Sequence, residues 1–313
     1  MGIVLVPKCL VTGGAGFIGS HLAEAFLAKG FQVRILDDFS TGNRANIEPF
    51  SDQLEIITGS VTDRSQVEKA VEGCELVFHL AALPSVAKSV EEPIPTHEIC
   101  ATGTLVVLDA ARRAKVRRVI YAGSSSAYGD QPGAARTEDD ALLPLSPYAA
   151  AKLAGEHYAS CFTAVYGLET VRLRFFNVFG PRQDPTSPYS GVIALFIKAM
   201  VQGQAPTIFG DGLQSRDFIY VENVVQAMMQ AAEAPKAAGK VYNIGHGASV
   251  NLLELVAALN QLLGTNIKPL HGPPRPGDIR MSQADISRAR SDLGFDPKVS
   301  FLEGLRRTLA AYR

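Results

Sequence analysis

The sequence predicts an α/β protein built on a doubly wound parallel sheet and completed by a smaller, discontinuous C-terminal lobe. Three observations lead to this fold class. They are a glycine-rich turn near the N-terminus, strand-like and helix-like segments that alternate up to about residue 180, and shorter segments interrupted by prolines beyond it. Strands that alternate with helices form parallel sheets with helices on both faces. We therefore expect residues 1–180 to form the main domain, with parts of 210–250 returning to it, and residues 181–313 to form mainly the second lobe.

The glycine-rich turn follows the first predicted strand, residues 9–12. Gly13, Gly16 and Gly19 have the spacing G-x-x-G-x-x-G, which permits a tight turn and a close approach of the backbone to a phosphate. The predicted helix 20–29 then directs its partially positive N-terminus at that phosphate. The arrangement is typical of a Rossmann domain that binds a dinucleotide, and a glycine-rich turn without a ligand is the alternative.

A carboxylate after the next predicted strand indicates which dinucleotide is bound. Strand 31–36 runs into Asp37, roughly 20 residues after the glycines. An acid at this position bonds the adenosine ribose hydroxyls and repels a 2′-phosphate, so we expect NAD rather than NADP. The other predicted cofactor contacts are Phe17, Ile18, Asp38, Ser40, Thr41, Gly42, Ser60, Val61, Leu80, Ala81, Ala82 and Phe176.

Further segments continue the alternation as far as residue 175. Strands are predicted over residues 54–58, 76–80, 117–122 and 168–175, and helices over 63–71, 96–114 and 149–165. Beyond residue 180 the chain is interrupted by Pro181, Pro185 and Pro188, and shorter elements follow, up to a proline-rich stretch at 273–277. We expect this part to cover the sheet as the smaller lobe.

Composition and charge exclude several functions. The chain is 47% hydrophobic and 19% charged with a formal net charge of −1, so neither nucleic acid nor an anionic membrane has an electrostatic reason to bind it. No apolar run is long enough to span a bilayer, and the apolar start at residues 3–6 is too short for a signal peptide. The 4 cysteines lack metal-ligand spacing, which predicts no metal site and the reduced thiols of a cytoplasmic protein.

Tyr148 and Lys152 are the candidate acid/base pair. Residues four apart on a helix share a face, so the phenol and the ammonium lie together. A tyrosine has a pKa near 10, roughly three units too high for a base at neutral pH. The Lys152 ammonium and a positively charged nicotinamide ring would both lower the pKa of Tyr148. The pair alone could be an ordinary surface pair, but after a dinucleotide-binding turn it indicates a nicotinamide enzyme.

A run of three serines, Ser124, Ser125 and Ser126, follows predicted strand 117–122. Ligands of doubly wound folds bind at the carboxyl ends of the strands, which is where this run lies. A hydroxyl there can hold a substrate hydroxyl and relay its proton, although any one of the three could instead cap the backbone.

Over its whole length the chain resembles the extended short-chain dehydrogenase/reductases, the family of nucleotide-sugar epimerases and dehydratases. The resemblance is carried by the segments 12–19 (TGGAGFIG), 124–129 (SSSAYG), 148–152 (YAAAK), 176–182 (FNVFGPR), 210–221 (GDGLQSRDFIYV) and 275–278 (RPGD). Such proteins are NAD enzymes, usually dimers, that act on sugars attached to a nucleoside diphosphate. The resemblance therefore implies a UDP-sugar substrate and a homodimer formed through helices 96–114 and 149–165.

The resemblance also implies roles for individual residues. Ser124, four residues before Tyr128, matches the catalytic serine or threonine, with Ser126 as the alternative, while Tyr148 and Lys152 match the acid/base pair. An arginine fork suits a diphosphate on charge and geometry. The implied substrate contacts are Ser124, Ser125, Ser126, Asn177, Val192, Arg216, Arg275, Asp278 and Ser282, of which Asn177, Arg216, Arg275 and Asp278 would hold the UDP part.

Three departures from the family pattern refine the expected activity. Ser125 and Ser126 stand where dehydratases and decarboxylases of the family carry a carboxylic acid, which favours a redox-neutral epimerisation. Cys100 stands where relatives often place an asparagine near the cofactor. Ser282, seven residues after Arg275, stands where members restricted to glucose and galactose carry a tyrosine, and its small side chain leaves room for an N-acetyl group.

Together these features imply a UDP-sugar 4-epimerase that prefers UDP-GlcNAc and UDP-GalNAc and accepts UDP-Glc and UDP-Gal. A UDP-glucuronate 4-epimerase or another nucleotide-sugar reductase or epimerase is the alternative among enzymes. A non-catalytic NAD-sensing regulator is disfavoured, because that class typically lacks the tyrosine or the lysine, and both are present here.

Overall fold

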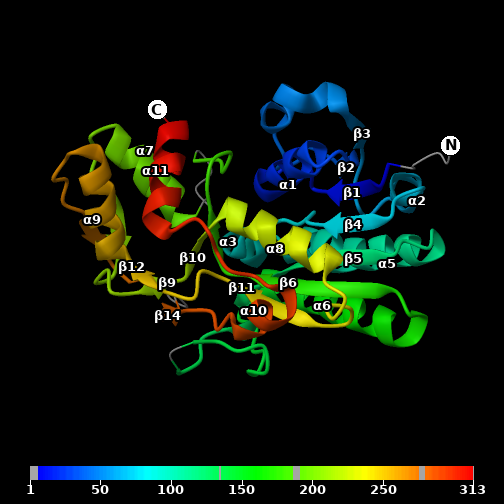
Figure 1. Cartoon of the computed structure of the whole chain (residues 1–313). Coiled ribbons are helices and arrows are strands. Elements are labelled where there is room, and N and C mark those ends of the chain that lie inside the picture. The colour runs from blue at the N-terminus through cyan, green and yellow to red at the C-terminus, as the bar shows by residue number, and fades with distance from the viewer. Residues whose placement is uncertain (1–5, 134, 186–190, 275–278, 313) are drawn as a thin grey trace.

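A seven-stranded sheet forms the centre of the protein, with the strand order β11-β6-β5-β4-β1-β2-β3 (Figure 1). The computed structural model describes residues 6–133, 135–185, 191–274 and 279–312. Every strand pairing of this sheet is parallel, and the chain moves outward from β1 in both directions, so the predicted doubly wound fold class is confirmed. The strands are β1 (Lys8–Thr12), β2 (Gln32–Asp37), β3 (Leu54–Thr58), β4 (Leu76–His79), β5 (Arg118–Ser124), β6 (Glu169–Phe175) and β11 (Val241–Ile244).

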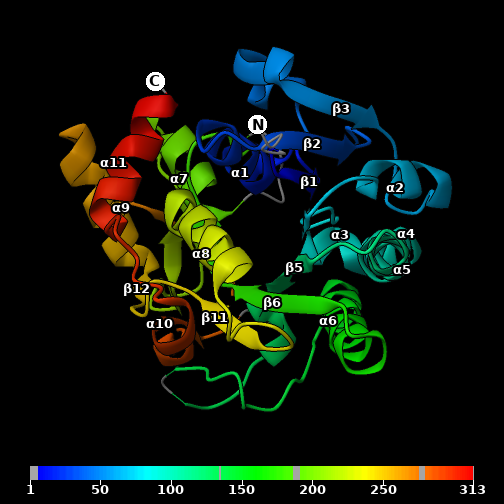
Figure 2. The same ribbon diagram turned by 45° about the vertical axis from the view of Figure 1, so that its right-hand side comes forward.

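Helices cover both faces of this sheet, as Figure 2 shows. Side chains alternate between the faces, so Val11 of β1 packs in one apolar cluster with Phe26 and Met228, whereas its neighbour Leu10 packs in another with Val107 and Phe162. The first face carries α1 (Phe17–Ala28) and α8 (Val221–Glu233), and the second carries α2 (Arg64–Val71), α5 (Gly103–Arg113) and α6 (Pro147–Tyr166). No helix among these described residues has the length and apolar character needed to cross a membrane.

Two predicted helices differ from the structure. Helix α1 begins at Phe17 rather than at residue 20, because Gly16 already serves as its N-cap. The predicted helix 96–114 is three pieces, namely α4 (Pro93–His97), the π-helical turn η3 (Glu98–Thr102) and α5. The widened turn is accompanied by a hydrogen bond from the Thr104 hydroxyl to the carbonyl of Cys100 (2.6 Å). Such π-turns occur frequently at functional sites, and this one faces α6.

The second half of the chain builds a separate apolar core from short strands and three helices. Phe179, Phe196, Leu255 and Leu305 are buried in this core. Its helices are α7 (Val192–Val201), α9 (Leu252–Leu263) and α11 (Phe301–Ala311). Its strands are β7 (Asn177–Phe179), β8 (Thr207–Phe209), β9 (Ser215–Arg216), β10 (Phe218–Tyr220), β12 (Val250–Asn251), β13 (Leu270–Gly272) and β14 (Met281–Ser282).

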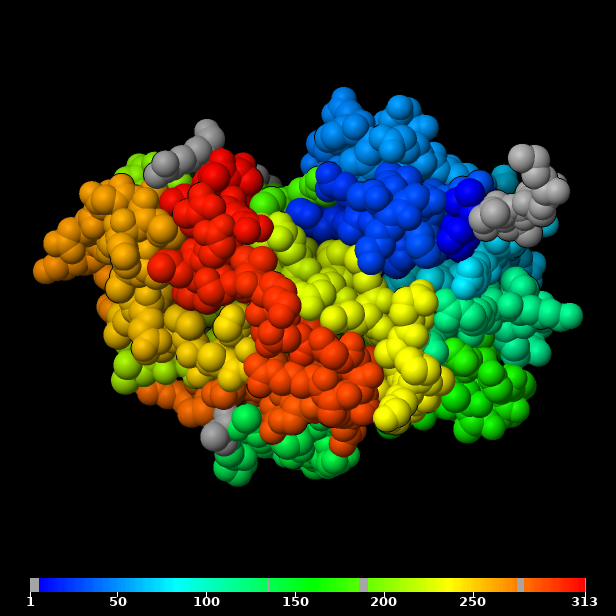
Figure 3. All heavy atoms as spheres, in the orientation of Figure 1, coloured from blue at the N-terminus to red at the C-terminus, as the bar shows by residue number. Residues whose placement is uncertain are grey.

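Segments of this second half also pack on the main sheet. Figure 3 shows the yellow segment that contains α8 between the blue N-terminal and the orange and red C-terminal segments. We propose a division near residue 180, with α8 and β11 assigned to the first unit.

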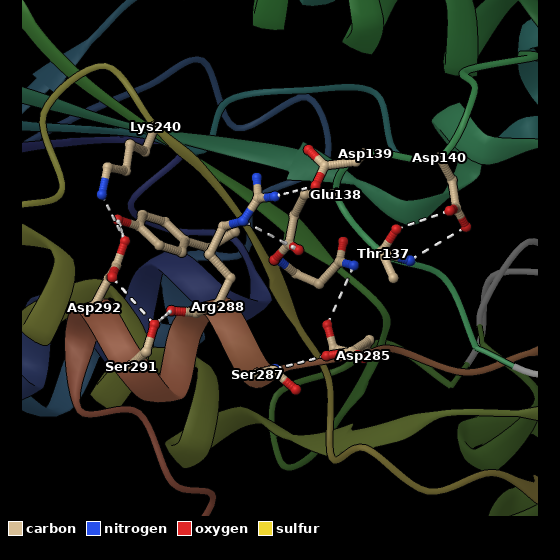
Figure 4. A network of polar contacts seen from close by, with 12 residues as sticks. Thr137, Glu138, Asp139, Asp140, Lys240, Asp285, Ser287, Arg288, Ser291 and Asp292 are labelled. Atoms are coloured by element: carbon tan, nitrogen blue, oxygen red, sulfur yellow. Dashed lines mark hydrogen bonds and ion pairs between the residues drawn. The ribbon is translucent and has the colours of Figure 1, made fainter.

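Helix α10 (Ser287–Leu293) lies against the edge strand β11 and the 137–140 loop (Figure 4). Arg288 reaches Asp139 at 2.6 Å and Glu138 at 3.6 Å, and Lys240 reaches Asp292 at 2.7 Å. The Arg288 pairs connect the C-terminal segment to the long loop that precedes α6, and the Lys240 pair connects it to the start of β11.

Candidate active site

The glycine turn between β1 and α1 is packed so closely that side chains cannot fit. Gly13 has φ +69°, a left-handed conformation, and a Cβ atom there would lie 2.9 Å from the backbone nitrogen of Ala81. A Cβ atom on Gly19 would lie 2.1 Å from the carbonyl oxygen of Gly13. Helix α1 follows directly, with Gly16 as an N-cap that makes no side-chain capping bond. The N–H groups of Gly13, Ala15 and Gly16 bond within the protein, and the N-terminus of α1 fits a pyrophosphate.

Asp37, at the end of β2, connects this turn to the next loop. Its carboxylate accepts hydrogen bonds from the backbone N–H groups of Ala15 (2.9 Å) and Phe39 (2.8 Å). Burial raises the pKa of Asp37, and these two bonds lower it. A carboxylate has about four lone-pair sites, so two remain with which Asp37 can accept ribose hydroxyls. The adjacent Asp38 accepts bonds from the backbone N–H and the hydroxyl of Ser40 (2.9 and 2.6 Å).

The other predicted cofactor residues lie at the same edge of the sheet. Thr41 and Gly42 follow β2, Ser60 and Val61 follow β3, Leu80, Ala81 and Ala82 follow β4, Phe176 follows β6, and Phe17 and Ile18 open α1. Gly42 lies against Asp37, because a Cβ atom on it would be 2.6 Å from the carboxylate. The carboxyl ends of parallel strands thus bring together residues from five separate segments.

A buried chain of hydrogen bonds supports the turn from behind. The Thr12 hydroxyl oxygen accepts bonds from the backbone N–H groups of Leu80 and Ala81 (both 3.2 Å), so its own hydrogen points to Nδ1 of His79 (2.8 Å). His79 must then donate from Nε2 to the hydroxyl of Thr104 (2.9 Å). Burial, together with the smaller effect of the nearby Lys152, lowers the pKa of His79 to about 3, so the ring is neutral.

Helix α6 places Tyr148 and Lys152 beside this edge of the sheet. Ser146 caps the helix by accepting a bond from the N–H of Ala149 (3.1 Å), and Pro147 occupies its first turn. Lys152 is buried, with Nζ 4.4 Å from the centre of the Tyr121 ring, whose hydroxyl donates to the carbonyl of Lys152 (2.8 Å). The acid/base pair is therefore held on a fixed helix rather than on a loop.

The pKa of Tyr148 differs from the expectation. Burial raises the pKa of Tyr148 well above its ordinary value, a nearby Cys100 raises it further, and a hydrogen bond with Ser124 lowers it. Burial likewise lowers the pKa of Lys152. The predicted lowering of the tyrosine pKa depends on the Lys152 ammonium and a nicotinamide cation together, and in the protein without NAD burial raises the pKa instead. A bound NAD⁺ ring would add a positive charge to that of Lys152.

Among the three serines, Ser124 is the one in contact with the tyrosine. It ends β5 and shares hydrogen bonds with Tyr148 and with the hydroxyl of Ser126 (2.8 Å). Its hydroxyl also accepts a bond from the backbone N–H of Ser126 (3.2 Å). The three serines line one cleft, in which Ser124 and Ser126 form a short chain of hydroxyls leading to Tyr148.

This cleft has a volume of about 300 Å³ and collects most of the predicted substrate residues. It is lined by Ser124, Ser125, Ser126, Tyr148, Phe176, Asn177, Arg216 and Ser282 together with Pro84, Val86, Tyr128, Gly129, Arg136, Phe175, Ile279 and Met281. Val192 is not among these residues: it opens α7 and packs against the second core. Arg275 and Asp278 lie outside the described residues.

Two of the additional lining residues were not predicted as site residues, and one of them lies outside every motif. Arg136 is 7% exposed and its backbone pairs with Ala284, so it reaches the cleft from an irregular loop that carries no sequence signal. Tyr128 lies in the serine-rich segment and is fully buried. Its hydroxyl accepts a bond from Arg174 (2.7 Å) and donates to Asn243 (2.6 Å).

Comparison with known proteins shows the family of the chain. Residues 9–245 match the model of the NAD dependent epimerase/dehydratase family. The chain belongs to this family. It is 39% identical over 310 residues to a UDP-glucose 4-epimerase of Mycolicibacterium smegmatis, covering 98% of each chain.

Solved structures of similar proteins have the same fold over their whole length. A UDP-N-acetylglucosamine 4-epimerase from Methanobrevibacter ruminantium M1, in complex with UDP-N-acetylmuramic acid, superposes with a TM-score of 0.93 at 40% identity, covering 98% of each chain. A UDP-glucuronic acid 4-epimerase from Bacillus cereus, in complex with UDP-glucuronic acid and NAD, superposes with a TM-score of 0.90 at 33% identity, covering 97% of this chain and 98% of that one. Family members this similar therefore act on sugars that differ at C2 and C6.

Proposed function

We propose that the protein is an NAD-dependent UDP-sugar 4-epimerase. One observation carries the proposal: a single cleft holds Tyr148, hydrogen-bonded to Ser124, together with Asn177 and Arg216, beside the cofactor edge of the sheet. The cleft thus combines an acid/base group with a cation suited to a diphosphate. The family match and the epimerases among the relatives support the same reaction.

The residues of the chain handle the proton of the reaction. Tyr148, as phenolate, takes the proton of the sugar 4-hydroxyl, directly or through Ser124, and later returns it. NAD, when bound, would supply the hydride acceptor and donor for C4 of the sugar. Lys152 would bond the nicotinamide ribose and keep a positive charge beside the tyrosine. Arg216 and Asn177 hold the UDP part while the sugar turns about its diphosphate linkage.

NAD, rather than NADP, is the proposed cofactor, because the buried Asp37 carboxylate would face a 2′-phosphate. The dinucleotide must be regenerated in each cycle, so we expect it to co-purify with the protein. Denaturing the purified protein and analysing the supernatant tests this: NAD is expected, and NADP would contradict the role of Asp37.

The proposed substrates are UDP-GlcNAc and UDP-GalNAc, with UDP-Glc and UDP-Gal also accepted. Ser282 lines the cleft and pairs with Arg216 in the β14–β9 ladder, so its small side chain lies near the diphosphate cation. The alternative, a UDP-glucuronate 4-epimerase, is favoured by a second cation in the cleft, Arg136. That cation is already engaged by the carbonyls of Pro132 (3.1 Å) and Gln131 and by Asp140 (3.8 Å), which makes a carboxylated sugar the second choice.

A panel of UDP-sugars tests the proposal. Purified protein is incubated separately with UDP-GlcNAc, UDP-Glc and UDP-glucuronate, and the epimers are resolved by chromatography. We expect the highest kcat/KM for UDP-GlcNAc and a lower one for UDP-Glc. Faster conversion of UDP-glucuronate would favour the alternative, and no epimer from any of the three would contradict the proposed activity.

We also propose a homodimer formed through the α4–η3–α5 segment and α6. Helices α4 and α6 of these segments enclose an apolar groove lined by Pro93, Ile94, His97, Pro147, Ala150, Ala151 and Ala154. Ile94 is 69% exposed, and a helix pair with an apolar outer face can complete a four-helix bundle with a second copy.

The cysteines are free thiols, which supports a cytoplasmic location.

Sedimentation of two variants tests the dimer. Ile94→Glu places a charge in the proposed interface and should yield monomers. Leu270→Glu changes a comparably exposed residue, 60% accessible, on β13 of the other lobe and should leave the dimer intact. Monomeric wild-type protein, or a dimeric Ile94→Glu variant, would contradict the proposed interface.

A further inference from the structure

Asp217 is a fully buried carboxylate next to the substrate cleft that no motif assigned to a role. It follows Arg216 in the chain and is itself absent from the cleft lining. Its carboxylate accepts hydrogen bonds from the backbone N–H groups of His246 (2.6 Å), Gly247 (3.0 Å) and Ala284 (3.1 Å). The negative charge is thus balanced by backbone dipoles, in the manner of a backbone nest around an anion.

The backbone of Asp217 makes two further connections, both to predicted substrate residues. Its N–H donates to the carbonyl of Ser282 (2.6 Å). Its carbonyl accepts bonds from the backbone N–H of Asn177 (3.0 Å) and from the Asn177 side-chain amide (3.3 Å). One residue therefore joins the segments that carry Asn177, Arg216 and Ser282.

The strands that meet at Asp217 are too short to hold one another by backbone pairing alone. Strands β9 and β14 have 2 residues each and β7 has 3. The approach is also close: a Cβ atom on Gly245 would lie 2.7 Å from the Asp217 carboxylate and 2.6 Å from Cβ of Ala284. The carboxylate fixes the Asp217 backbone, and so its bonds to Asn177 and Ser282, by accepting from the N–H groups of the 246–247 loop and of Ala284, two residues after β14.

We propose that Asp217 is a positioning residue for the nucleotide part of the substrate, an inference that rests on the proposed UDP-sugar specificity. It holds Arg216, Asn177 and the Ser282 segment at one fixed spacing, so that the cleft binds the uridine diphosphate of any UDP-sugar. It takes no part in the proton or hydride transfer. Its loss therefore weakens binding of UDP and of UDP-sugars alike, while NAD binding and the chemical step are retained.

The variant Asp217→Asn tests this role, because it keeps the size of the side chain. The new NH₂ group must face either His246 or the pair Gly247 and Ala284, all of which are N–H donors, so at least one bond is lost. We expect the Kd for UDP, measured by titration calorimetry, and the KM for UDP-sugars to rise about tenfold or more. We expect kcat to change less than threefold and the NAD content to stay at the wild-type level.

Asp211→Asn is the matched control. Asp211 also contacts the segment that precedes Ser282, through a bidentate pair with Arg280 (2.7 and 2.9 Å), but both partners are exposed. Solvent screens such a pair, so we expect the Kd for UDP to change less than twofold. An equal loss in both variants would indicate a general effect of charge removal and would overturn the proposal.

A second variant covers the case in which Asp217→Asn does not fold. Gly245→Ala leaves Asp217 in place but pushes a methyl group against its carboxylate, and it should weaken UDP binding in the same direction. Unchanged UDP affinity in either folded variant, or a fall in kcat without a rise in KM, would overturn the inference. If wild-type protein binds neither UDP nor any UDP-sugar, it is the proposed function that fails.

Discussion

The cofactor half and the substrate half of the protein are held together in different ways. In the cofactor half, strands of 4 to 7 residues pair in one parallel sheet, and the helices between them bury regular apolar stripes. In the substrate half, strands of 2 or 3 residues form small separate sheets, and buried side chains such as Asp217 bind the backbone of several segments. In the first half, buried side chains such as Arg34 and Arg118, each bonded to three backbone carbonyls, add to a continuous sheet. In the second half, Asp217 connects strands of only 2 or 3 residues.

The polar groups buried in each half reflect this difference. Thr12, His79 and Thr104 form a line of side chains between two strands and a helix, and each strand keeps its full backbone pairing. The Asp217 carboxylate instead takes backbone N–H groups that no strand pairs. Substitutions in the cofactor half should therefore act mainly through the glycine turn and the reacting groups. Substitutions in the substrate half should act on UDP-sugar recognition.

The largest expected effect comes from the reacting group itself. Tyr148→Phe removes the hydroxyl that bonds Ser124 and changes little packing, so we expect turnover to fall at least a hundredfold while NAD stays bound. Turnover and the NAD content of the purified variant are measured together. A variant that retains more than a few per cent of the wild-type rate would remove Tyr148 from the proposed role.

The next largest effect is expected for a substitution in the glycine turn, which should affect the binding of NAD but not of UDP. In Gly19→Ala the new Cβ atom would lie 2.1 Å from the carbonyl of Gly13, so the turn must shift and NAD affinity should fall at least tenfold. UDP affinity, a property of the other half, should stay within twofold.

Gly191→Ala serves as the control for the turn variant, because its Cβ atom would meet only the mobile end of the Gln183 side chain, at 3.0 Å. It should keep its NAD. Retention of NAD by Gly19→Ala, or a parallel loss of UDP binding, would contradict the separation between the halves.

Ser282→Tyr should sharpen the comparison within the substrate half. The added ring would fill the space assigned to the N-acetyl group, and overpacking of this kind costs about 1–3 kcal/mol, so kcat/KM for UDP-GlcNAc should fall roughly ten- to a hundredfold. Activity on UDP-Glc should fall much less, because its 2-hydroxyl is small. The ratio of the two efficiencies is measured in wild type and variant, and an equal fall for both substrates would show that Ser282 does not face C2.

The smallest effect on activity is expected at His79, which should instead control the pH dependence of stability. Its folded pKa is about 3, against about 6.5 in an unfolded chain. A base whose pKa is lower in the folded than in the unfolded protein stabilises the fold at pH values above its unfolded pKa. This stabilisation is lost as the pH falls below 6.5, because the unfolded chain takes up the proton. Between pH 7 and pH 5 the loss amounts to about 2 kcal/mol.

Denaturant unfolding of wild type and His79→Asn at both pH values measures this contribution. The fall in unfolding free energy between pH 7 and pH 5 should be about 2 kcal/mol smaller in the variant. Identical falls in the two proteins would mean that His79 does not carry the pH dependence.

The local pattern of residues was sufficient to predict the main structural elements of the cofactor half. Glycine spacing, the strand before it and Asp37 after the next strand are short-range features, as is the i, i+4 placement of Tyr148 and Lys152 on α6. Hydrophobic periodicity and turn chemistry determine such features within about 30 residues. Local patterns placed the start of α1 three residues late and missed the π-turn at 98–102, where Cys100 and Ala101 pack against Ala151 of α6.

Only the tertiary structure decided which residues meet across the cleft. It brought Ser124 to Tyr148, paired Ser282 with Arg216, brought Arg136 in from an irregular loop and buried Asp217 among three segments. The physical reason is distance along the chain: Asp217 and Ala284 are 67 positions apart, and nothing local to either predicts that one bonds the other. The proposed recognition of the substrate therefore depends on contacts that exist only once segments far apart in the chain have folded together.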